Sequence, residues 1–370
     1  MKYFILAGES SGDIHGANLM EALKNQDTSA EFVYWGGDAM KAVHGNPLKH
    51  IRELAFMGFW EVLINIRTIL NLLNQCKKDI SENEPDILIL IDYPGFNLRM
   101  AKWAHLKGIK VVYYIVPQVW AWHKSRVFQL KKYTDLLIAI LPFEEEFYKN
   151  NECNVFYVGH PLLDEIKKFS LQQTNEKNLK TIDLALLPGS RHQEVKHMLP
   201  VYLKAADQLK ISCVIAASNN LPLSFYEKIV KMANLQNIQV EIRQNKTYEI
   251  LRSSKHAFVT SGTATLETAL FKVPQVIGYK GNTISYIIAK KLITLKYISL
   301  VNLILDKMLV KELIQSELNI SNLIQSYHDL VKREKQILHG YEELIHLLGD
   351  EGASFRAATL ISKVAQSGKM

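Results

Sequence analysis

The sequence lacks the cysteine patterns that mark secreted and zinc-binding proteins. Cys76, Cys153 and Cys213 are scattered along the chain and form no CxxC pair. Neither a disulfide framework nor a zinc site is therefore indicated. The opening residues, MKYFILAGESSGD, contain a strand-length apolar run but no cleavage-site pattern, so we see no secretory signal.

Long uncharged runs are also missing. No window of about 20 residues is free of charge, which is the length needed to span a bilayer as a helix. The most apolar candidate, residues 54–75, still carries Glu61 and Arg67. We therefore expect a cytoplasmic protein that touches a membrane surface at most and does not cross it.

The totals fit a globular chain with an anionic partner. A length of 370 residues predicts two domains, and 48% apolar with 22% charged residues is the profile of a folded protein. The net charge of +7 favours nucleic acid, an anionic membrane surface or phosphorylated substrates. The basic residues are dispersed and no helix-turn-helix, RNA-recognition or zinc pattern occurs, so we expect no nucleic-acid partner.

The stretch 259–272, VTSGTATLETALFK, predicts a phosphate site. An apolar strand ends at Val259, a small-residue turn follows at Ser261, Gly262 and Thr263, and helical spacing then begins. The first amides of such a helix lack intrahelical partners and attract phosphate. Glu267 lies about one turn inside the helix, near enough to accept hydrogen bonds from a sugar hydroxyl. An ordinary capped helix with an acid near its start fits the same pattern.

The first part of the chain reads as a doubly wound domain. Tyr3–Ala7 predicts a strand, and Gly8, Glu9, Ser10, Ser11, Gly12 and Asp13 form the turn into a helix. Glycines at 8, 12 and 16 do not match the GxGxxG fingerprint, so we discount NAD. Residues 86–92, DILILID, predict a buried parallel strand that ends at Asp92. An acid at that edge of a sheet is well placed to act as a general base, although a cap or turn is the simpler alternative.

Residues 56–73 form the most apolar segment. Its apolar side chains cover most of the circumference of a helix, with Glu61 and Arg67 as the only charges. A buried core helix and a helix that docks on a bilayer or receives acyl chains both fit this pattern.

A polar stretch, 167–180, predicts a linker to a second α/β domain. There the strand 182–187 leads into Pro188, Gly189, Ser190 and Arg191, whose guanidinium can hold phosphate oxygens with two parallel hydrogen bonds. We place the first domain at residues 1–166, joined by a C-terminal helix at 345–370, and the second at 167–344.

Ten short motifs occur in order and together resemble one family, the lipid-A-disaccharide synthases. They are GESSGDIHGA (8–17), MGFWEVL (57–63), IDYPGFN (91–97), PQVWAW (117–122), LPFEEEFY (141–148), VGHPLLD (158–164), LLPGSR (186–191), SGTATLE (261–267), SLVNLI (299–304) and LVKELIQ (309–315). The resemblance implies a GT-B fold, an α/β architecture of two doubly wound Rossmann-like domains facing across a cleft.

The resemblance also implies a reaction. A family member transfers 2,3-diacylglucosamine from UDP to the 6-hydroxyl of 2,3-diacylglucosamine 1-phosphate (lipid X), inverts the anomeric centre, and needs no metal or cofactor. By motif, Asp92 is implied as the base. The implied UDP and phosphate ligands are Arg191, Ser261, Gly262, Thr263 and Glu267. The implied cleft-lining residues are Gly8, Glu9, Ser10, Ser11, Gly12, Asp13, Trp122, Asn302 and Gln315.

Further expectations concern membranes and partners. The resemblance implies that Phe56, Met57, Phe59, Trp60 and Leu63 face acyl chains, that the protein is peripheral at the inner face of the inner membrane, and that it forms a homodimer with exchanged C-terminal segments. No Asp-x-Asp pair occurs in the chain, so a helix dipole and Arg191 must stabilise the leaving diphosphate. Gly95 stands where the family commonly has an acid, so we expect no second carboxylate near Asp92.

Two alternatives stay open from the sequence. A UDP-sugar 2-epimerase shares the two-domain architecture, but it has no need of an acyl-facing helix at 56–73. A non-catalytic protein that binds anionic membranes is consistent with the net charge.

Overall fold

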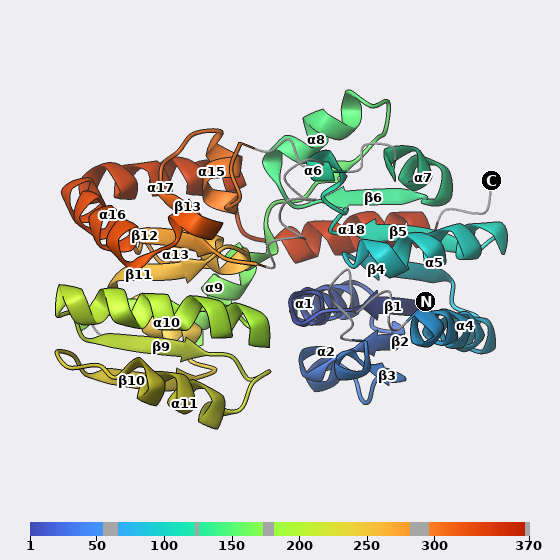
Figure 1. Cartoon of the computed structure of the whole chain (residues 1–370). Helices are drawn as coiled ribbons and strands as arrows, with labels where there is room; N and C mark the ends of the chain where they lie inside the picture. The colour runs from blue at the N-terminus through green and yellow to red at the C-terminus, as the bar shows by residue number, and fades with distance from the viewer. Residues whose placement is uncertain (55–65, 123–125, 173–180, 282–295, 367–370) are drawn as a thin grey trace. The chain divides into compact units, whose positions relative to one another are not determined.

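The chain folds into two compact units (Figure 1). The computed structural model describes residues 1–54, 66–122, 126–172, 181–281 and 296–366. Unit 1 combines Met1–Asp164 with Asp350–Met370, and unit 2 is Glu165–Gly349. Each unit is a parallel sheet with helices on both faces, which confirms the predicted α/β class with two Rossmann-like domains.

Unit 1 contains, in its described part, a seven-stranded sheet of order β3-β2-β1-β4-β5-β6-β7 whose neighbouring strands are all parallel. The strands are β1 (Lys2–Ala7), β2 (Glu31–Gly36), β3 (Lys49–His50), β4 (Ile87–Ile91), β5 (Lys110–Tyr114), β6 (Leu136–Ala139) and β7 (Phe156–Tyr157). The central strands are apolar at successive positions because helices cover both faces of the sheet.

The helices of unit 1 divide between the two faces. One face carries α4 (Ile66–Asn83), α5 (Pro94–Leu106) and α7 (Arg126–Tyr133), whose apolar side chains join the core with Phe4 and Leu88. The other face carries α1 (Ser10–Gln26), which packs on α2 (Asp38–Val43) and on the C-terminal helix α18 (Ala353–Gln366). Two shorter helices, α6 (Val119–Trp122) and α8 (Pro142–Lys149), follow β5 and β6.

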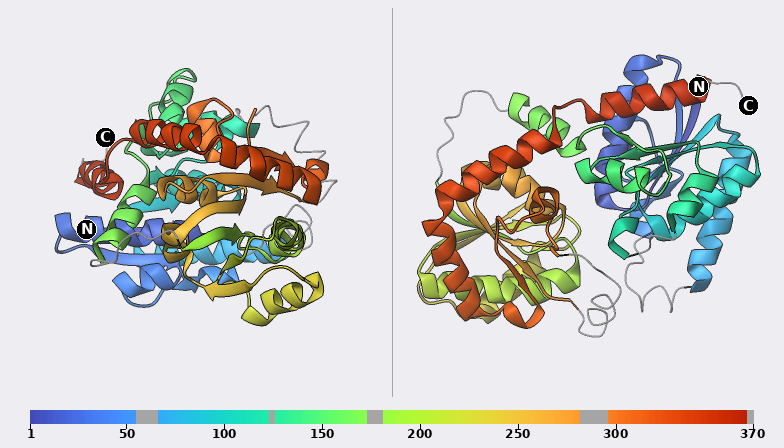
Figure 2. Two further views of the ribbon diagram at one scale, coloured as in Figure 1. Left: turned by 90° about the vertical axis from the view of Figure 1, so that its left-hand side faces the viewer. Right: turned by 90° about the horizontal axis from the view of Figure 1, so that it is seen from above.

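Helix α18 returns to unit 1 after the chain has formed unit 2 (Figure 2). Its first turn is held by Asp164, whose carboxyl oxygens accept hydrogen bonds from the amides of Gly352 and Ser354. Arg356 donates to the carbonyl of Val158 at 2.8 Å, and Lys110 donates to the carbonyl of Val364 at 2.8 Å near the other end of the helix. The apolar face of α18, including Ala357 and Ile361, is buried.

Unit 2 has a six-stranded parallel sheet of order β10-β9-β8-β11-β12-β13 among its described residues. The strands are β8 (Ile182–Leu187), β9 (Cys213–Ala217), β10 (Val240–Gln244), β11 (Ser254–Thr260), β12 (Gln275–Tyr279) and β13 (Glu312–Ile314). The helices are α10 (His192–Leu209), α11 (Leu223–Ala233), α12 (Thr247–Ser253), α13 (Thr263–Leu270), α15 (Leu300–Leu305), α16 (Ile320–Lys332) and α17 (Glu334–Leu348). Helices α12 and α13 bury one face of the sheet, while Phe258 on the other face contacts Tyr202 of α10 and Tyr327 of α16.

Helix α9 (Pro161–Gln172) carries the chain from unit 1 to unit 2. The first residues of the predicted linker, 167–172, therefore continue a helix, and residues 173–180 lie outside the described residues. The apolar stretch 56–73 is described only from Ile66 onward. There Leu72 and Leu73 are buried in the core while Leu70 is 53% exposed, so this part of the segment is a partly buried amphipathic helix. Among the described helices, none has both the length and the apolar character that crossing a membrane requires.

Candidate active site

The candidate base lies at the switch point of the unit 1 sheet, where the strand order reverses direction. Strands β1 and β4 are neighbours, with Ala7 paired to Ile91, so Gly8 and Asp92 follow directly at adjacent strand ends. Open α/β sheets bind ligands in the crevice at such a point. The structure thus brings the predicted turn at Gly8 and the predicted base Asp92 together.

The backbone at Asp92 adopts a conformation that side chains rarely favour. Asp92 and Tyr93 have φ of +44° and +49°, both in the left-handed region. Two side chains hold this turn through the backbone carbonyl of Asp92. That carbonyl accepts hydrogen bonds from Asn97 Nδ2 and from the Tyr113 hydroxyl, each at 2.7 Å. Strained residues persist only where the surroundings fix them, and they cluster at functional sites.

Tyr93 joins this turn to the turn after β1. Its ring lies where a Cβ at Gly8 would be, with ring atoms 2.4 Å from that position. Its hydroxyl donates to the carbonyl of Leu54 at 3.2 Å. Glycine is therefore required at position 8 because the ring leaves no room for a side chain.

The electrostatics of the turn suit proton transfer near neutral pH. Burial raises the pKa of the Asp92 carboxyl to about 7, with a smaller contribution from the charge of Glu9. Burial likewise raises the pKa of Glu144 to about 7, and the charge of Asp92 adds to that shift. A general base works best when its pKa lies near the working pH.

These electrostatic effects correct the expectation that no second carboxylate lies near Asp92. Gly95 supplies none, but Glu9 and Glu144 reach the same neighbourhood from the ends of β1 and β6. Glu144 is buried and accepts hydrogen bonds from Trp120 Nε1 at 3.0 Å and from the Leu141 amide at 3.1 Å. Sequence reasoning missed Glu144 because it resembles an ordinary acid in the first turn of a helix.

The turn from Gly8 to Asp13 is not uniformly exposed. Ser10 is exposed, Glu9 and Ser11 are partly exposed, and Gly12 is buried. Asp13 lies inside the fold, where its carboxyl accepts hydrogen bonds from the amides of Gly37, Ala39 and Met40. Asp13 therefore holds the start of α2 and does not line a surface.

The switch point of the unit 2 sheet lies between β8 and β11. Leu187 pairs with Val259, so the turn of Gly189 and Arg191 and the turn of Ser261 and Gly262 follow at adjacent strand ends. The structure thus brings the two predicted phosphate-binding elements to one place. The family resemblance implied that both bind UDP, whereas local sequence patterns alone could not pair them, because strand order depends on long-range contacts.

Arg191 precedes α10 and is well exposed, with 59% of its side chain accessible. Glu194 shapes the turn before it by accepting hydrogen bonds from the amides of Ser190 and Arg191. A Cβ at Gly189 would lie 2.5 Å from Glu194 Oε2, and Gly189 has φ of +102°, so only glycine fits there. The Arg191 guanidinium is 3.4 Å from Glu194 Oε1.

Helix α13 begins immediately after Gly262 and no side chain caps it. Gly262 and Thr263 are exposed at the switch point, and in the first turn of the helix the amide of Thr265 donates to the Gly262 carbonyl at 3.1 Å. Glu267 lies one turn further, where burial raises the pKa of its carboxyl to about 7. The Tyr248 hydroxyl is within 3.4 Å of Glu267 Oε1.

Asn302 is a buried residue whose side chain is used within unit 2. Its Oδ1 accepts from the amides of Leu309 and Val310, and its Nδ2 donates to the Val310 carbonyl and to Glu312 Oε1 at 2.8 Å each. With no exposed surface, Asn302 organises the fold and does not line a ligand surface in this conformation.

Glu312 is the centre of this network and was missed from the sequence. It accepts hydrogen bonds from the Ile298 amide at 2.8 Å and from the Ser299 hydroxyl at 2.6 Å, besides Asn302. The Ile298 carbonyl in turn accepts from Ser261 Oγ at 2.9 Å. Glu312 therefore ties α15 to the predicted phosphate-binding turn.

Replacing Glu312 with alanine is expected to destabilise unit 2 by about 2–4 kcal/mol, because buried donors lose their acceptor. Calorimetric unfolding of the purified protein measures this effect as a lower transition temperature. Glu317→Ala, an exposed acid five residues away, is the matched control and should leave the transition within a degree or so. Equal unfolding temperatures for the two variants would contradict the structural role of Glu312.

Gln315 directly follows β13 and starts a 3₁₀ turn (Gln315–Glu317) with φ of +55°. Its Nε2 is buried and has no hydrogen-bond partner in the part of the chain that the structure describes. A buried donor without a partner is costly, so this amide is a candidate to meet a ligand.

The remaining predicted residues are only partly placed. Trp122 is the last residue of α6, and its side chain lies outside what the structure describes. Phe56, Met57, Phe59, Trp60 and Leu63 also lie outside the described residues. Their roles stay predictions.

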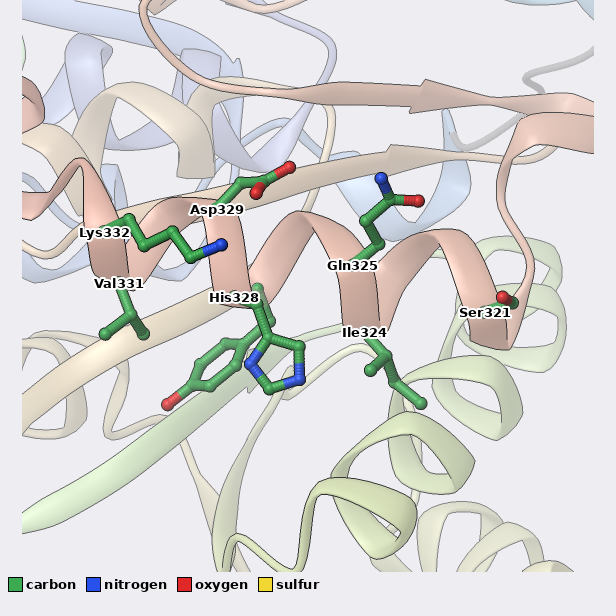
Figure 3. Close-up of a pocket in the computed structure, with 8 residues that line it drawn as sticks. Ser321, Ile324, Gln325, His328, Asp329, Val331 and Lys332 are labelled. Atoms are coloured by element: carbon green, nitrogen blue, oxygen red, sulfur yellow. The ribbon is translucent and has the colours of Figure 1, made fainter.

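A surface hollow along α16 contains none of the predicted site residues. It is lined by Ser321, Ile324, Gln325, Tyr327, His328, Asp329, Val331 and Lys332. Figure 3 shows Gln325 and Asp329 on one side of the helix and Ile324, His328 and Val331 on the other. Ligand sites have convergent polar groups, so this hollow does not compete with the switch points.

Two doubly wound Rossmann-like units in one chain are the architecture of the GT-B fold. A solved structure of UDP-GlcNAc 2-epimerase from Neisseria meningitidis, bound to UDP-GlcNAc, superposes with a TM-score of 0.68 over 98% of this chain and 100% of that chain. The two sequences are 12% identical, so the similarity establishes the fold alone.

The family follows from the sequence comparisons. The lipid-A-disaccharide synthetase family model matches residues 3–364. Lipid-A-disaccharide synthase of Syntrophus aciditrophicus is 37% identical, covering 97% of each chain, and that of Pseudoalteromonas translucida is 36% identical, covering 97% of this chain and 96% of the relative. The chain belongs to the lipid-A-disaccharide synthase family, and it is a glycosyltransferase of lipid A biosynthesis.

Proposed function

We propose that this enzyme transfers 2,3-diacylglucosamine from UDP to the 6-hydroxyl of 2,3-diacylglucosamine 1-phosphate, releasing UDP and the β-1,6-linked disaccharide 1-phosphate. The observation that carries the chemistry is Asp92, a partly buried acid with a pKa of about 7, fixed in a strained turn at a sheet switch point. In this proposal Asp92 removes the proton of the 6-hydroxyl while that oxygen attacks the anomeric carbon. A single displacement inverts the anomeric centre.

The leaving group is stabilised from unit 2. As the bond between the anomeric carbon and the diphosphate oxygen breaks, negative charge develops on UDP. In the proposal, Arg191 and the first amides of α13, after Ser261, Gly262 and Thr263, offset that charge. Glu267 accepts hydrogen bonds from the ribose hydroxyls, and Gln315 donates its buried amide on the donor side.

We also propose where the enzyme works and how it assembles. The acyl chains of both substrates keep them in a membrane, so we place the enzyme at the inner face of the inner membrane as a peripheral protein. In this proposal Phe56, Met57, Phe59, Trp60 and Leu63 meet acyl chains. We further propose a homodimer with exchanged C-terminal segments, in which α18, the segment that packs on unit 1 after the chain has formed unit 2, is the one exchanged.

Release of UDP from UDP-2,3-diacylglucosamine by purified protein in detergent tests the reaction. We expect release only when 2,3-diacylglucosamine 1-phosphate is present, together with a disaccharide detected by mass spectrometry. If the folded protein released no UDP but converted soluble UDP-sugars, the transferase proposal would be wrong and the epimerase alternative would take its place.

A further inference from the structure

Residues 93–134 of unit 1 contain no acid, although the chain has 37 Asp and Glu among its 370 residues. The same stretch carries many cations: Arg99, Lys102, Lys107, Lys110, Lys124, Arg126, Lys131 and Lys132. It begins immediately after Asp92 and includes α5 and α7, which pack against each other. Of these cations, Arg99 and Arg126 stand near the N-terminal ends of α5 and α7, at the same edge of the sheet as Asp92, and they are the candidates to bind an anionic ligand there.

Arg99 is directed toward the start of α5. Its Nη1 donates to the carbonyl of Gly95, so the guanidinium folds back over the first turn of the helix. That turn follows Asp92 in the chain, and Arg99 itself is exposed. The N-terminal end of α5 adds a positive partial charge at the same position.

Arg126 approaches from the neighbouring helix. It is the first residue of α7, is partly buried, and lies within electrostatic range of both Arg99 and the Tyr113 hydroxyl. Helix α7 follows β5, the parallel neighbour of β4, so its first residue lies at the carboxyl edge of the sheet, where Asp92 follows β4. Partial burial lowers the pKa of the Arg126 guanidinium, and the charge of Arg99 adds to this effect.

Arg99 and Arg126 are close enough for their charges to interact, so one multivalent anion can bind both guanidinium groups. Arginine binds phosphate through parallel hydrogen bonds from its planar fork, and two arginines match the charge of a phosphate monoester. We propose that Arg99 and Arg126 form the subsite for the phosphate monoester of the acceptor sugar, and so orient its hydroxyl toward Asp92. This inference rests on the proposed function.

Selectivity for the phosphate tests the inference. The rate of disaccharide formation is measured in neutral detergent with 2,3-diacylglucosamine 1-phosphate and with 2,3-diacylglucosamine, for the natural enzyme, Arg126→Gln and Arg99→Gln. We expect each variant to raise KM for the phosphorylated acceptor by about 10-fold or more, the scale of a lost charge-assisted hydrogen bond. KM for the UDP-sugar should stay within about two-fold, because the variants lose an interaction with the acceptor and none with the UDP-sugar.

The phosphate-free acceptor is the internal reference. The natural enzyme should discriminate against it, and the variants should lose that discrimination. A folding defect lowers the rate with both acceptors equally, so discrimination that survives in both variants overturns the proposal. Lys102→Gln, an exposed cation one turn further along α5, is the matched control and should keep full discrimination.

Anionic phospholipid offers the same phosphate chemistry, and a vesicle assay separates the two sources. Variants that lose binding to phosphatidylglycerol vesicles but keep their acceptor discrimination would assign the arginines to the membrane and overturn the proposal. Failure of the proposed function is a different result, because the natural enzyme itself would then form no disaccharide.

Discussion

Replacing Asp92 with asparagine is expected to lower the turnover number for disaccharide formation by at least about 100-fold, the scale of a lost general base. Asparagine keeps the size of the side chain and its place in the strained turn, but it cannot accept the proton of the attacking hydroxyl. Turnover is measured as UDP release at saturating substrates. Asp86→Asn, an exposed acid just before the same strand, is the control and should keep full activity.

The pH dependence gives a second measurement of the same role. Asp92 must be ionised to accept a proton, so kcat/KM should rise as the pH increases through about 7 and level off above it. Glu9→Gln removes a neighbouring charge that raises the pKa of Asp92, so the rise should move to lower pH. Near-normal turnover of Asp92→Asn, or a pH profile that Glu9→Gln does not move, would assign Asp92 an orienting role.

Replacing Arg191 with alanine is expected to reduce kcat by at least about 100-fold, because a charge-stabilising donor acts most strongly on the departing diphosphate. Arg191 is exposed and the turn before it is held by Glu194 and Gly189, so its truncation should leave the fold intact. Arg191→Lys keeps the positive charge but loses the planar fork of the guanidinium. Its kcat should lie between that of the natural enzyme and that of Arg191→Ala.

Arg243→Ala is the matched control for this substitution. Arg243 is a partly exposed arginine of unit 2 that also contacts an acid, Glu241, at 2.7 Å, but it lies on β10 at the far edge of the sheet. We expect that variant to keep its activity. If Arg191→Ala raised only KM for the UDP-sugar and left kcat unchanged, Arg191 would bind the ground state and the transition state equally. Arg191 would then bind the substrate without stabilising the leaving group.

Much of the fold was predictable because local sequence patterns indicate its strands and turns. Residues 182–187 and 86–92 were predicted as strands, and the structure has β8 at Ile182–Leu187 and β4 at Ile87–Ile91. The second-domain turns were predictable because glycine and small residues mark them. The two-residue β3 carried too short a pattern to be recognised.

The candidate site was less predictable because its geometry depends on long-range pairing. Asp13 and Asn302 are polar residues in recognisable motifs, which suggested a ligand, but each satisfies buried amides of its own unit. Glu144 approaches Asp92 only because β4, β5 and β6 lie side by side. A sequence pattern gives the type of a side chain, whereas its partner depends on which strands become neighbours.

The return of α18 has a consequence for synthesis on the ribosome. The face of unit 1 that α18 covers, including the end of α1 at Gln26, stays open until Phe355 and Thr359 have left the exit tunnel. At 5–20 residues per second, the chain between Asp164 and Asp350 takes roughly 10–40 s to translate. For that time the nascent first unit offers an apolar surface to chaperones, while unit 2 is contiguous and can complete its fold earlier.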